Sequence, residues 1–222
     1  MRRFDEIFAI AADRKGGPDA LNALLEPPLP REELAKMPDD RWLALFSRHV
    51  FNAGFNWKVI DSKWDGFEAA FHGFDVAKCA MMNDDWFDEL LQDTRIVRHG
   101  AKIQSVRDNA AFLQELAAEH GSAGHVFAHW PSPDYIGLLA LLKTRGSRLG
   151  GTTAQYALRF AGADGFVLSR DVIARLVAEG VIDKAPTGKA AMARVQGAFR
   201  EWSAQSGRSL KEISRVLAMS IG

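Results

Sequence analysis

The chain has 222 residues, of which 47% are hydrophobic and 25% are charged, and its formal net charge at pH 7 is zero. This length can bury a substantial core, as one domain or as two closely packed lobes. No apolar run could span a bilayer, the first residues are too charged for a signal peptide, and the single cysteine (Cys79) excludes an intrachain disulfide, so we expect a cytoplasmic protein without a membrane partner.

The spacing of hydrophobic residues predicts helices along nearly the whole chain, with no alternating strand and no internal repeat. Residues 26–31 are the exception, because their prolines favour an extended connection. In chain order, we expect helices over residues 4–11, from Pro18, from Asp39, from Asp75, from Asn83, over residues 99–120, from Ser132, and over residues 133–143, 152–161, 172–178, 187–204 and 210–219. The sequence therefore predicts an all-α fold.

A glycine-rich turn joins the helices predicted over residues 133–143 and 152–161. Gly150 and Gly151 can adopt positive φ, and the free amides of the second helix, which begins at Thr152 and Thr153, favour an anion such as phosphate. Arg145 and Arg148 flank the turn and add positive charge. A tight connection between two helices uses the same residues, so the local sequence is consistent with either a phosphate clamp or a purely structural hairpin.

Charge is distributed unevenly along the sequence. Residues 1–94 contain 11 Lys/Arg and 18 Asp/Glu, whereas residues 141–222 contain 13 Lys/Arg and 6 Asp/Glu. These segments carry net charges of −7 and +7, and a basic lobe around the hairpin would suit a nucleic-acid backbone. The alternative is that the charges are scattered over solvated helix faces.

Several separated blocks resemble the DNA-3-methyladenine glycosylase I family of the helix-hairpin-helix DNA glycosylase superfamily. They are GFNW at 54–57, FHGFD at 71–75, LQDTRIVRHGAKIQ at 91–104, NAAFL at 109–113, LLKTRG at 141–146 and GTT at 151–153. The resemblance covers about half the chain, in order and spacing, and beyond Ala161 the chain looks more like the wider superfamily. It implies one glycosylase domain over residues 1–222, with two helical lobes, a cleft between them, a divergent segment at 1–45 and the hairpin region at 133–163.

The resemblance implies that Asp171 is the catalytic carboxylate. It follows the hairpin at the start of a helix, where an ionised carboxylate can stabilise an oxocarbenium-like sugar or activate water. The structural alternative is that Ser169 or Asp171 caps this helix, and both roles can coexist. Superfamily members that also cleave the strand use a hairpin lysine, and here Thr152 or Thr153 stands in that place, so we expect a monofunctional enzyme.

The same resemblance places Trp57 in the base pocket, where its ring stacks on the extruded base. The family has a glutamate eight residues before this tryptophan, whereas this chain has His49, which puts 3-methyladenine specificity in doubt. Asn52 and Asn56 are alternative readers of the base edge, or they satisfy local backbone groups. Without the resemblance, a tryptophan at this position would more often be a core residue.

A second predicted phosphate contact combines Arg98 with Lys102, although a solvated helix start would use the same residues. The family binds zinc through residues near both chain ends, but neither end here supplies four ligands, so we expect no metal and no other cofactor. The superfamily resemblance also suggests a monovalent cation at the hairpin. The expected partner is duplex DNA containing a damaged base, bound by a monomer associated with the nucleoid.

The sequence thus predicts a monofunctional glycosylase that hydrolyses the N-glycosidic bond of an alkylated purine in base excision repair. The competing hypothesis is a non-enzymatic DNA-binding module that keeps the hairpin but has an altered base pocket. A third hypothesis is a helical protein-interaction domain whose hairpin is only structural. Base release separates the first hypothesis from the second, and salt-dependent DNA binding separates both from the third.

Overall fold

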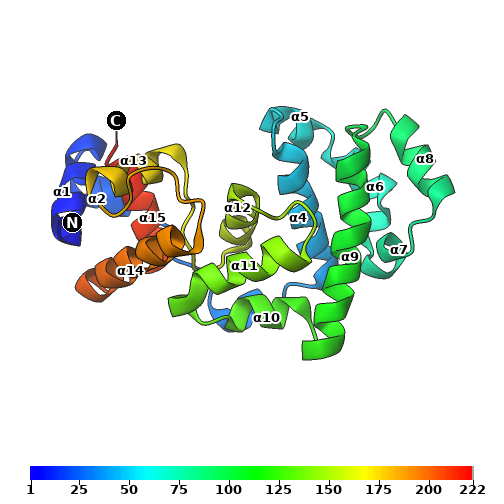
Figure 1. The fold of residues 1–222 in the computed structure, drawn as a ribbon. Helices are drawn as coiled ribbons and strands as arrows, with labels where there is room; N and C mark the ends of the chain where they lie inside the picture. Colours follow the sequence, from blue (N-terminus) through cyan, green and yellow to red (C-terminus); the bar gives the residue numbers. More distant parts are fainter. Residues whose placement is uncertain (222) are drawn as a thin grey trace. The chain divides into compact units, whose positions relative to one another are not determined.

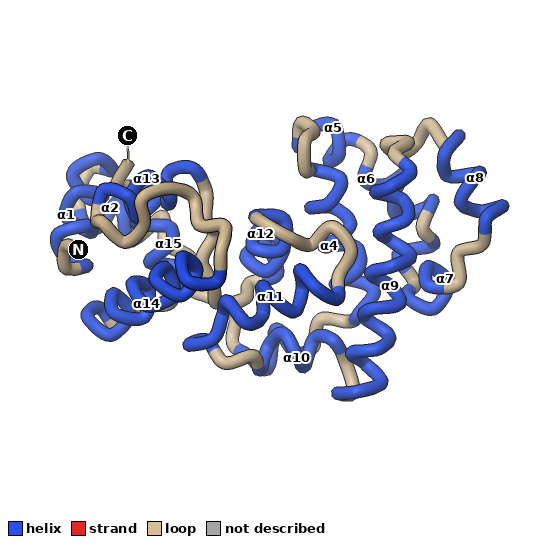
Figure 2. The backbone as a smooth tube through the Cα atoms, viewed as in Figure 1, coloured by secondary structure: helices blue, strands red, loops and turns tan. Residues whose placement is uncertain are grey.

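A computed structural model describes residues 1–221 of the chain. This part contains fifteen α-helices and two short 3-10 helices but no strand (Figure 2), which confirms the all-α prediction. The helices, most of which are labelled in Figure 1, are α1 (Phe4–Lys15), α2 (Pro18–Asn22), α3 (Arg31–Ala35), α4 (Asp39–Asn52), α5 (Trp57–Ser62), α6 (Trp64–Ala70), η1 (His72–Phe74), α7 (Val76–Ala80), α8 (Asp84–Gln92), α9 (Gly100–His120), α10 (Ala123–His129), η2 (Ser132–Asp134), α11 (Tyr135–Arg145), α12 (Thr152–Ala161), α13 (Arg170–Ala178), α14 (Lys189–Ser206) and α15 (Leu210–Met219).

The chain divides into two compact units, each assembled from segments that are distant in sequence. Unit 1 comprises residues 1–29, 130–138 and 162–222, and unit 2 comprises residues 30–129 and 139–161. The predicted single glycosylase domain over residues 1–222 stays a prediction. None of the helices in residues 1–221 is both long and apolar enough to cross a membrane.

In unit 1, α15 packs against α1, α13 and α14 around an aromatic core. The rings of Phe166 and Phe199 stack with centroids 4.4 Å apart, and Tyr135 contacts Phe166 at 4.8 Å. Trp202 is completely buried beside Phe199. Burial of these large rings provides much of the hydrophobic stabilisation of the unit.

The first residues of the chain are fixed to the C-terminal helices of unit 1. The backbone amide of Arg2 donates to Glu179 (2.8 Å), and the indole of Trp202 donates to the carbonyl of Arg2 (3.1 Å). The amide of Phe4 donates to the side chain of Gln205 (2.7 Å). Residues 1–29, part of the divergent N-terminal segment, therefore complete unit 1 by packing and hydrogen bonding.

A polar network, largely buried, joins α13 to residues near the beginning and the end of the chain. Glu179 accepts from the guanidinium groups of Arg2 (2.8 Å) and Arg175 (3.2 Å). Arg175 also donates to the hydroxyl and carbonyl oxygens of Ser220, both at 2.7 Å. The network holds the C-terminal half of α13 in place, and Asp171 lies in the first turn of the same helix.

In unit 2, α4 packs against α9, α10 and α12, and α7 and α8 pack against α9. Trp42, Phe46 and Phe127 form one aromatic group in the core, with Trp42 and Phe127 centroids 4.7 Å apart. The 21-residue α9, green in Figure 1, buries an apolar stripe that includes Ile103 and Leu113, as its helical periodicity predicts.

Folding removes the charge asymmetry that the sequence shows. Unit 1 contains 13 Lys/Arg and 12 Asp/Glu, and unit 2 contains 15 Lys/Arg and 16 Asp/Glu. The predicted basic lobe is therefore wrong, because segments of opposite charge combine in each unit. Positive charge remains local, since residues 139–161 contain four Lys/Arg and no acidic residue.

Candidate functional site

Four aromatic rings from three helices of unit 2 meet in what we call the aromatic cluster: His49 of α4, Trp57 of α5, and Tyr156 and Phe160 of α12. The His49 ring lies 5.5 Å from Trp57 and 5.1 Å from Phe160, measured between ring centroids. Trp57 also lies 5.7 Å from Phe160 and 6.0 Å from Tyr156. The cluster joins two predicted base-pocket residues to the second helix of the hairpin.

The aromatic cluster is partly open to solvent. Trp57 is 39% exposed and Phe160 is 61% exposed, whereas His49 beneath them is 4% exposed. Exposed aromatic rings lose favourable burial unless something covers them. A flat heterocycle could stack on these rings, which makes the cluster a candidate for binding a nucleobase.

His49 has one paired and one unpaired ring nitrogen. Its Nδ1 lies 2.9 Å from the carbonyl oxygen of Leu45, while its Nε2 is buried and has no hydrogen-bond partner among residues 1–221. Burial lowers the pKa of His49, and the nearby positive charge of Arg48 lowers it as well, although the hydrogen bond to Leu45 opposes this. The imidazole is therefore neutral at physiological pH.

The two asparagines predicted near the base have different surroundings. Asn52 is buried, and neither its Oδ1 nor its Nδ2 has a partner in the described chain. Asn56 is exposed and caps α5, because its Oδ1 accepts from the amide of Lys58 at 3.0 Å. Asn52 and His49 are three residues apart on α4, so they share one face of the helix and leave three buried polar atoms unpaired there.

The hairpin loop between α11 and α12 is held against α9 by Asn109. The fully buried side chain of Asn109 accepts from the amide of Ser147 (2.7 Å) and donates to its carbonyl (3.0 Å). Leu149 is buried in the same loop, and Arg148 has a positive φ of 60°. A non-glycine residue is rarely stable in this conformation, so the two anchors on either side of Arg148 fix the loop.

Of the two hairpin glycines, only Gly151 has a positive φ, at 58°. Gly150 is half-buried, and a side chain there would meet only Lys143 at ordinary contact distance. Thr152 and Thr153 are the first two residues of α12, with Thr152 exposed and Thr153 half-buried. The N-terminal amides of α12 therefore follow the loop directly, as the phosphate-clamp hypothesis requires.

The two arginines of the hairpin differ in their partners. Arg145 donates to Glu115 (3.1 Å) and Glu119 (3.0 Å), which lowers the pKa of Glu119. Arg148 is exposed and forms no ion pair within residues 1–221. Arg148 is therefore the hairpin cation that is available to a ligand, whereas two carboxylates already neutralise Arg145.

Lys102 does not occupy the surface position predicted for it. Its side chain is buried, and its ammonium donates to the carbonyl oxygens of Phe51 (3.0 Å) and Ala53 (2.6 Å) at the end of α4. Burial, followed by the charge of Arg148, lowers the pKa of Lys102 to about 8. We therefore correct the predicted phosphate contact from Lys102: this residue caps α4 from inside unit 2, while Arg98 remains exposed.

Asp171 lies in the first turn of α13 in unit 1, and its side chain is exposed. The helix is capped by Ser169, whose hydroxyl accepts from the amide of Val172 at 3.3 Å. The Asp171 carboxylate has no hydrogen-bond or ion-pair partner within residues 1–221. The structure thus assigns the cap to Ser169 and leaves the carboxylate of Asp171 free to act on a ligand.

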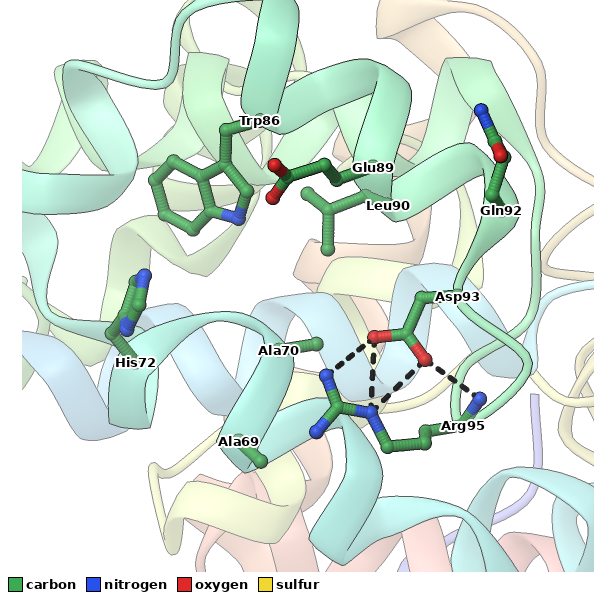
Figure 3. Close-up of a pocket in the computed structure, with 9 residues that line it drawn as sticks. All are labelled: Ala69, Ala70, His72, Trp86, Glu89, Leu90, Gln92, Asp93 and Arg95. Carbon is green, nitrogen blue, oxygen red and sulfur yellow. Dashed lines mark hydrogen bonds and ion pairs between the residues drawn. The ribbon is translucent and has the colours of Figure 1, made fainter.

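A separate pocket of about 560 Å³ lies on unit 2 at α6, η1 and α8 (Figure 3). Figure 3 shows the Glu89 carboxylate beside the Trp86 indole, with the ion pair of Asp93 and Arg95 (2.7 Å) on the opposite side. The hydrogen bond from Arg95 lowers the pKa of Asp93. This pocket contains none of the predicted site residues, and its polar groups are exposed or already paired, so the unpaired atoms at the aromatic cluster are the better evidence for a ligand site.

Within residues 1–221, no group of three or more His, Cys, Asp or Glu residues is arranged to hold a metal ion. Cys79 is buried, and its burial raises the pKa of its thiol to about 12, so it is unreactive.

Sequence reasoning missed three residues of the candidate site. Tyr156 and Phe160 are four residues apart on α12, so their helical spacing could have indicated a shared face beside the hairpin. Asn109 carries no local signal, because its partner Ser147 is 38 residues away in sequence.

The chain is similar to known proteins over part of its length. Residues 36–134 match the model of the methyladenine glycosylase family. Over 63 residues the chain is 41% identical to DNA-3-methyladenine glycosylase 1 of Escherichia coli (strain K12), an alignment covering 28% of this chain and 34% of that protein. The chain thus spans about a third of the length of this curated relative.

Solved structures extend the similarity of fold to most of the chain. A structure of 3-methyladenine DNA glycosylase I from Staphylococcus aureus has a TM-score of 0.51 at 22% identity and covers 62% of this chain and 80% of that chain. The 8-oxoguanine glycosylase/lyase of Methanocaldococcus jannaschii, in complex with DNA, has a TM-score of 0.54 at 12% identity and covers 96% and 95%. The chain is thus similar to the methyladenine glycosylase family over residues 36–134, and over most of its length its fold is similar to those of these two solved structures.

Proposed function

We propose that this protein is a monofunctional DNA glycosylase that releases an alkylated purine from duplex DNA in base excision repair. The observation that carries the proposal is the aromatic cluster together with the unpaired buried polar atoms of His49 and Asn52. His49, Asn52 and Trp57 lie within the segment that matches the methyladenine glycosylase family, whereas Tyr156 and Phe160 lie outside it. A flipped base is held by stacking and by hydrogen bonds to its edge, and this cluster offers both. A cationic alkylated purine would also gain cation–π attraction from Trp57.

In this proposal, Asp171 acts on the sugar of the extruded nucleotide. Cleavage of the N-glycosidic bond develops positive charge on the sugar, which an ionised carboxylate stabilises, or the carboxylate activates the attacking water. The exposed, unpaired carboxylate of Asp171 supports this role, since no protein cation competes for it within residues 1–221. The products are a free base and an abasic site.

Duplex DNA is the proposed partner of a protein that acts as a monomer at the nucleoid. The N-terminal amides of α12, including those of Thr152 and Thr153, bind a phosphate group with Gly150, Gly151 and Arg148. The carboxylate-paired Arg145 supports the loop, and Arg98 makes a second phosphate contact. The proposed protein needs no structural zinc. Backbone carbonyl groups of the loop between α11 and α12 would hold a monovalent cation, which would supply positive charge for the phosphate.

The proposal is tested by measuring free base released from methylated duplex DNA, resolved by chromatography. Release of 3-methyladenine or 7-methylguanine establishes the glycosylase activity. DNA binding without release of any base would instead identify a non-enzymatic DNA-binding module. Because Thr152 and Thr153 supply no amine for a Schiff base, borohydride should trap no covalent adduct, and a trapped adduct would overturn the monofunctional assignment.

The hairpin contact predicts different effects for the two arginines. Arg148→Ala should weaken binding to duplex DNA to a similar extent for all sequences and reduce the slope of log K against log[salt] by about one, because one phosphate contact is lost. Arg145→Ala is the matched control: its charge is already neutralised by Glu115 and Glu119, so the slope should change less. Fluorescence anisotropy at several salt concentrations measures both, and equal slopes for wild type and Arg148→Ala would remove Arg148 from the DNA contact.

A further inference from the structure

Two histidines, His125 and His129, lie about one helical turn apart on α10. Both side chains are exposed, and their ring centroids are 4.2 Å apart with an interplanar angle of 28°. Residues at positions i and i+4 of a helix are neighbours on one face, with Cβ atoms about 5–6 Å apart. The two imidazole rings therefore stack on the outer face of α10, and neither belongs to the aromatic cluster or to the hairpin.

The packing of α10 in unit 2 holds this pair on a fixed element. Phe127 lies on the buried face of the helix, where its ring contacts that of Trp42 at 4.7 Å between centroids. At the first turn, the carboxylate of Asp39 accepts from the amide of Ala123 at 3.1 Å. Residues 125 and 129 each lie about 200° around the helix from residue 127, so the histidines face solvent while Phe127 faces the core. A site built on a packed helix keeps its geometry.

The hydrogen bonds of the two rings leave nitrogen atoms available to a ligand. Nδ1 of His129 lies 3.0 Å from the carbonyl oxygen of His125, and it carries the hydrogen because a carbonyl can only accept. The lone pair of the neutral His129 ring is then at Nε2, the nitrogen further from the backbone. The ring nitrogens of His125 have no hydrogen-bond partner within residues 1–221. Histidines that bind metals commonly donate their other ring nitrogen to a backbone carbonyl, as His129 already does.

We infer that His125 and His129 together chelate one late first-row divalent metal ion, such as Ni²⁺, Cu²⁺ or Zn²⁺, on the outer face of α10. Imidazole nitrogen suits these ions, and two histidines at i and i+4 of a helix can bind the same ion. Two nitrogens bound to one ion lie about 3 Å apart, since each metal–nitrogen bond is about 2 Å long. Small rotations of the two exposed side chains bring their stacked rings to this separation.

The remaining coordination positions of the ion face solvent. Within residues 1–221, no third His, Cys, Asp or Glu joins the pair to form a larger metal-binding group, so water molecules complete the coordination. The site therefore differs from a structural zinc site, which has four protein ligands, and it binds its ion reversibly. It goes beyond the proposed base release, in which neither histidine takes part.

The test titrates NiCl₂ into the tag-free protein at pH 7.5, after removal of bound metal with a chelator, and measures binding by calorimetry. Wild type should bind one Ni²⁺ per chain, and Mn²⁺ should bind about ten-fold or more weakly, because affinity at nitrogen sites rises from Mn²⁺ to Ni²⁺. His125→Gln and His129→Gln should each weaken Ni²⁺ binding about ten-fold or more, since each leaves a single imidazole. Both positions are exposed, so neither substitution disturbs the core.

His120→Gln is the matched control. His120 is an exposed histidine at the end of α9, and its ring lies beside the carboxylate of Glu119 (3.5 Å) instead of another histidine. This variant should keep the wild-type affinity for Ni²⁺. Binding to wild type should also weaken when the pH is lowered from 7.5 to 5.5, because a protonated imidazole cannot bind a metal ion.

Unchanged Ni²⁺ affinity in His125→Gln and His129→Gln would overturn the inference. Two Ni²⁺ ions per wild-type chain that fall to one in each variant would also overturn it, because the histidines would then bind separately. Failure of wild type to bind Ni²⁺ would overturn it as well. Each of these results leaves the proposed glycosylase activity standing, since base release is measured without added metal.

Discussion

Asp171→Asn is expected to lower the rate of base release from methylated duplex DNA by about 10²- to 10⁴-fold, the usual contribution of a positioned acid–base group. The substitution keeps the shape of the side chain but removes the negative charge that stabilises the developing cation on the sugar. Binding of duplex DNA should be retained, since the proposed phosphate contacts lie in the hairpin. Single-turnover release and DNA affinity, measured on the same preparations, separate the two effects.

Two control variants distinguish catalysis from helix capping. Ser169→Ala removes the side chain that caps α13, so it should cost about 1 kcal/mol of stability while base release by the folded protein persists. Asp183→Asn changes an exposed carboxylate elsewhere in unit 1 and should affect neither property. If Asp171→Asn releases base at the wild-type rate and loses only a little stability, then Asp171 serves the helix terminus alone.

The largest expected effect on stability comes from Glu179→Gln in unit 1. The carboxylate of Glu179 is buried between Arg2 and Arg175, and the substitution leaves the buried guanidinium of Arg175 without its counter-charge. Removal of one partner from such a network should lower the free energy of unfolding by about 3 kcal/mol. Urea denaturation at pH 7 measures the change.

The exposed pair of Lys36 and Glu33 provides the control, because Glu33→Gln should change the free energy of unfolding by less than about 0.5 kcal/mol. A change this small in Glu179→Gln would mean that the buried network does not stabilise unit 1.

The loss of stability expected for Glu179→Gln depends on pH. Burial raises the pKa of Glu179, but the hydrogen bonds from Arg2 and Arg175 outweigh it, and the net shift is downward from the ordinary value of 4.5. A carboxyl group whose pKa is lower in the folded state stabilises the protein fully above pH 4.5, and this stabilisation is lost as the pH falls through the folded-state pKa. The stability difference between wild type and Glu179→Gln should therefore be constant from pH 7 to about pH 5 and shrink below pH 4.5.

The helices that the sequence predicts correctly are those with a strong local signal. The helix expected at residues 152–161 and the last helix at residues 210–219 match α12 and α15, and Asp75 and Asn83 cap α7 and α8 as expected. The α-helices missing from that prediction, α3, α5, α6 and α10, have only five to seven residues each. A helix this short shows too few turns for its hydrophobic periodicity to be recognised.

The candidate site is predictable only in part. The resemblance identifies His49 and Trp57, and the structure brings them into one cluster. The local spacing of residues in the sequence does not show that Phe160 lies over His49 and Trp57, because α4 and α12 are about one hundred residues apart in sequence. Lys102 illustrates the opposite error, because a lysine near a helix start was expected at the surface and its long side chain instead reaches buried carbonyl groups.

The sequence by itself determined the all-α class, the helix boundaries with strong caps, the hairpin and the family resemblance, because each depends on neighbouring residues or on a spaced motif. Only the tertiary structure decided the balance of charge in each unit, the burial of Lys102, the anchoring of the hairpin by Asn109, and the unpaired atoms of His49 and Asn52. These properties depend on contacts between segments that are distant in sequence. Local periodicity carries no information about such partners, because burial and hydrogen bonding are set by whichever helix packs against a given face.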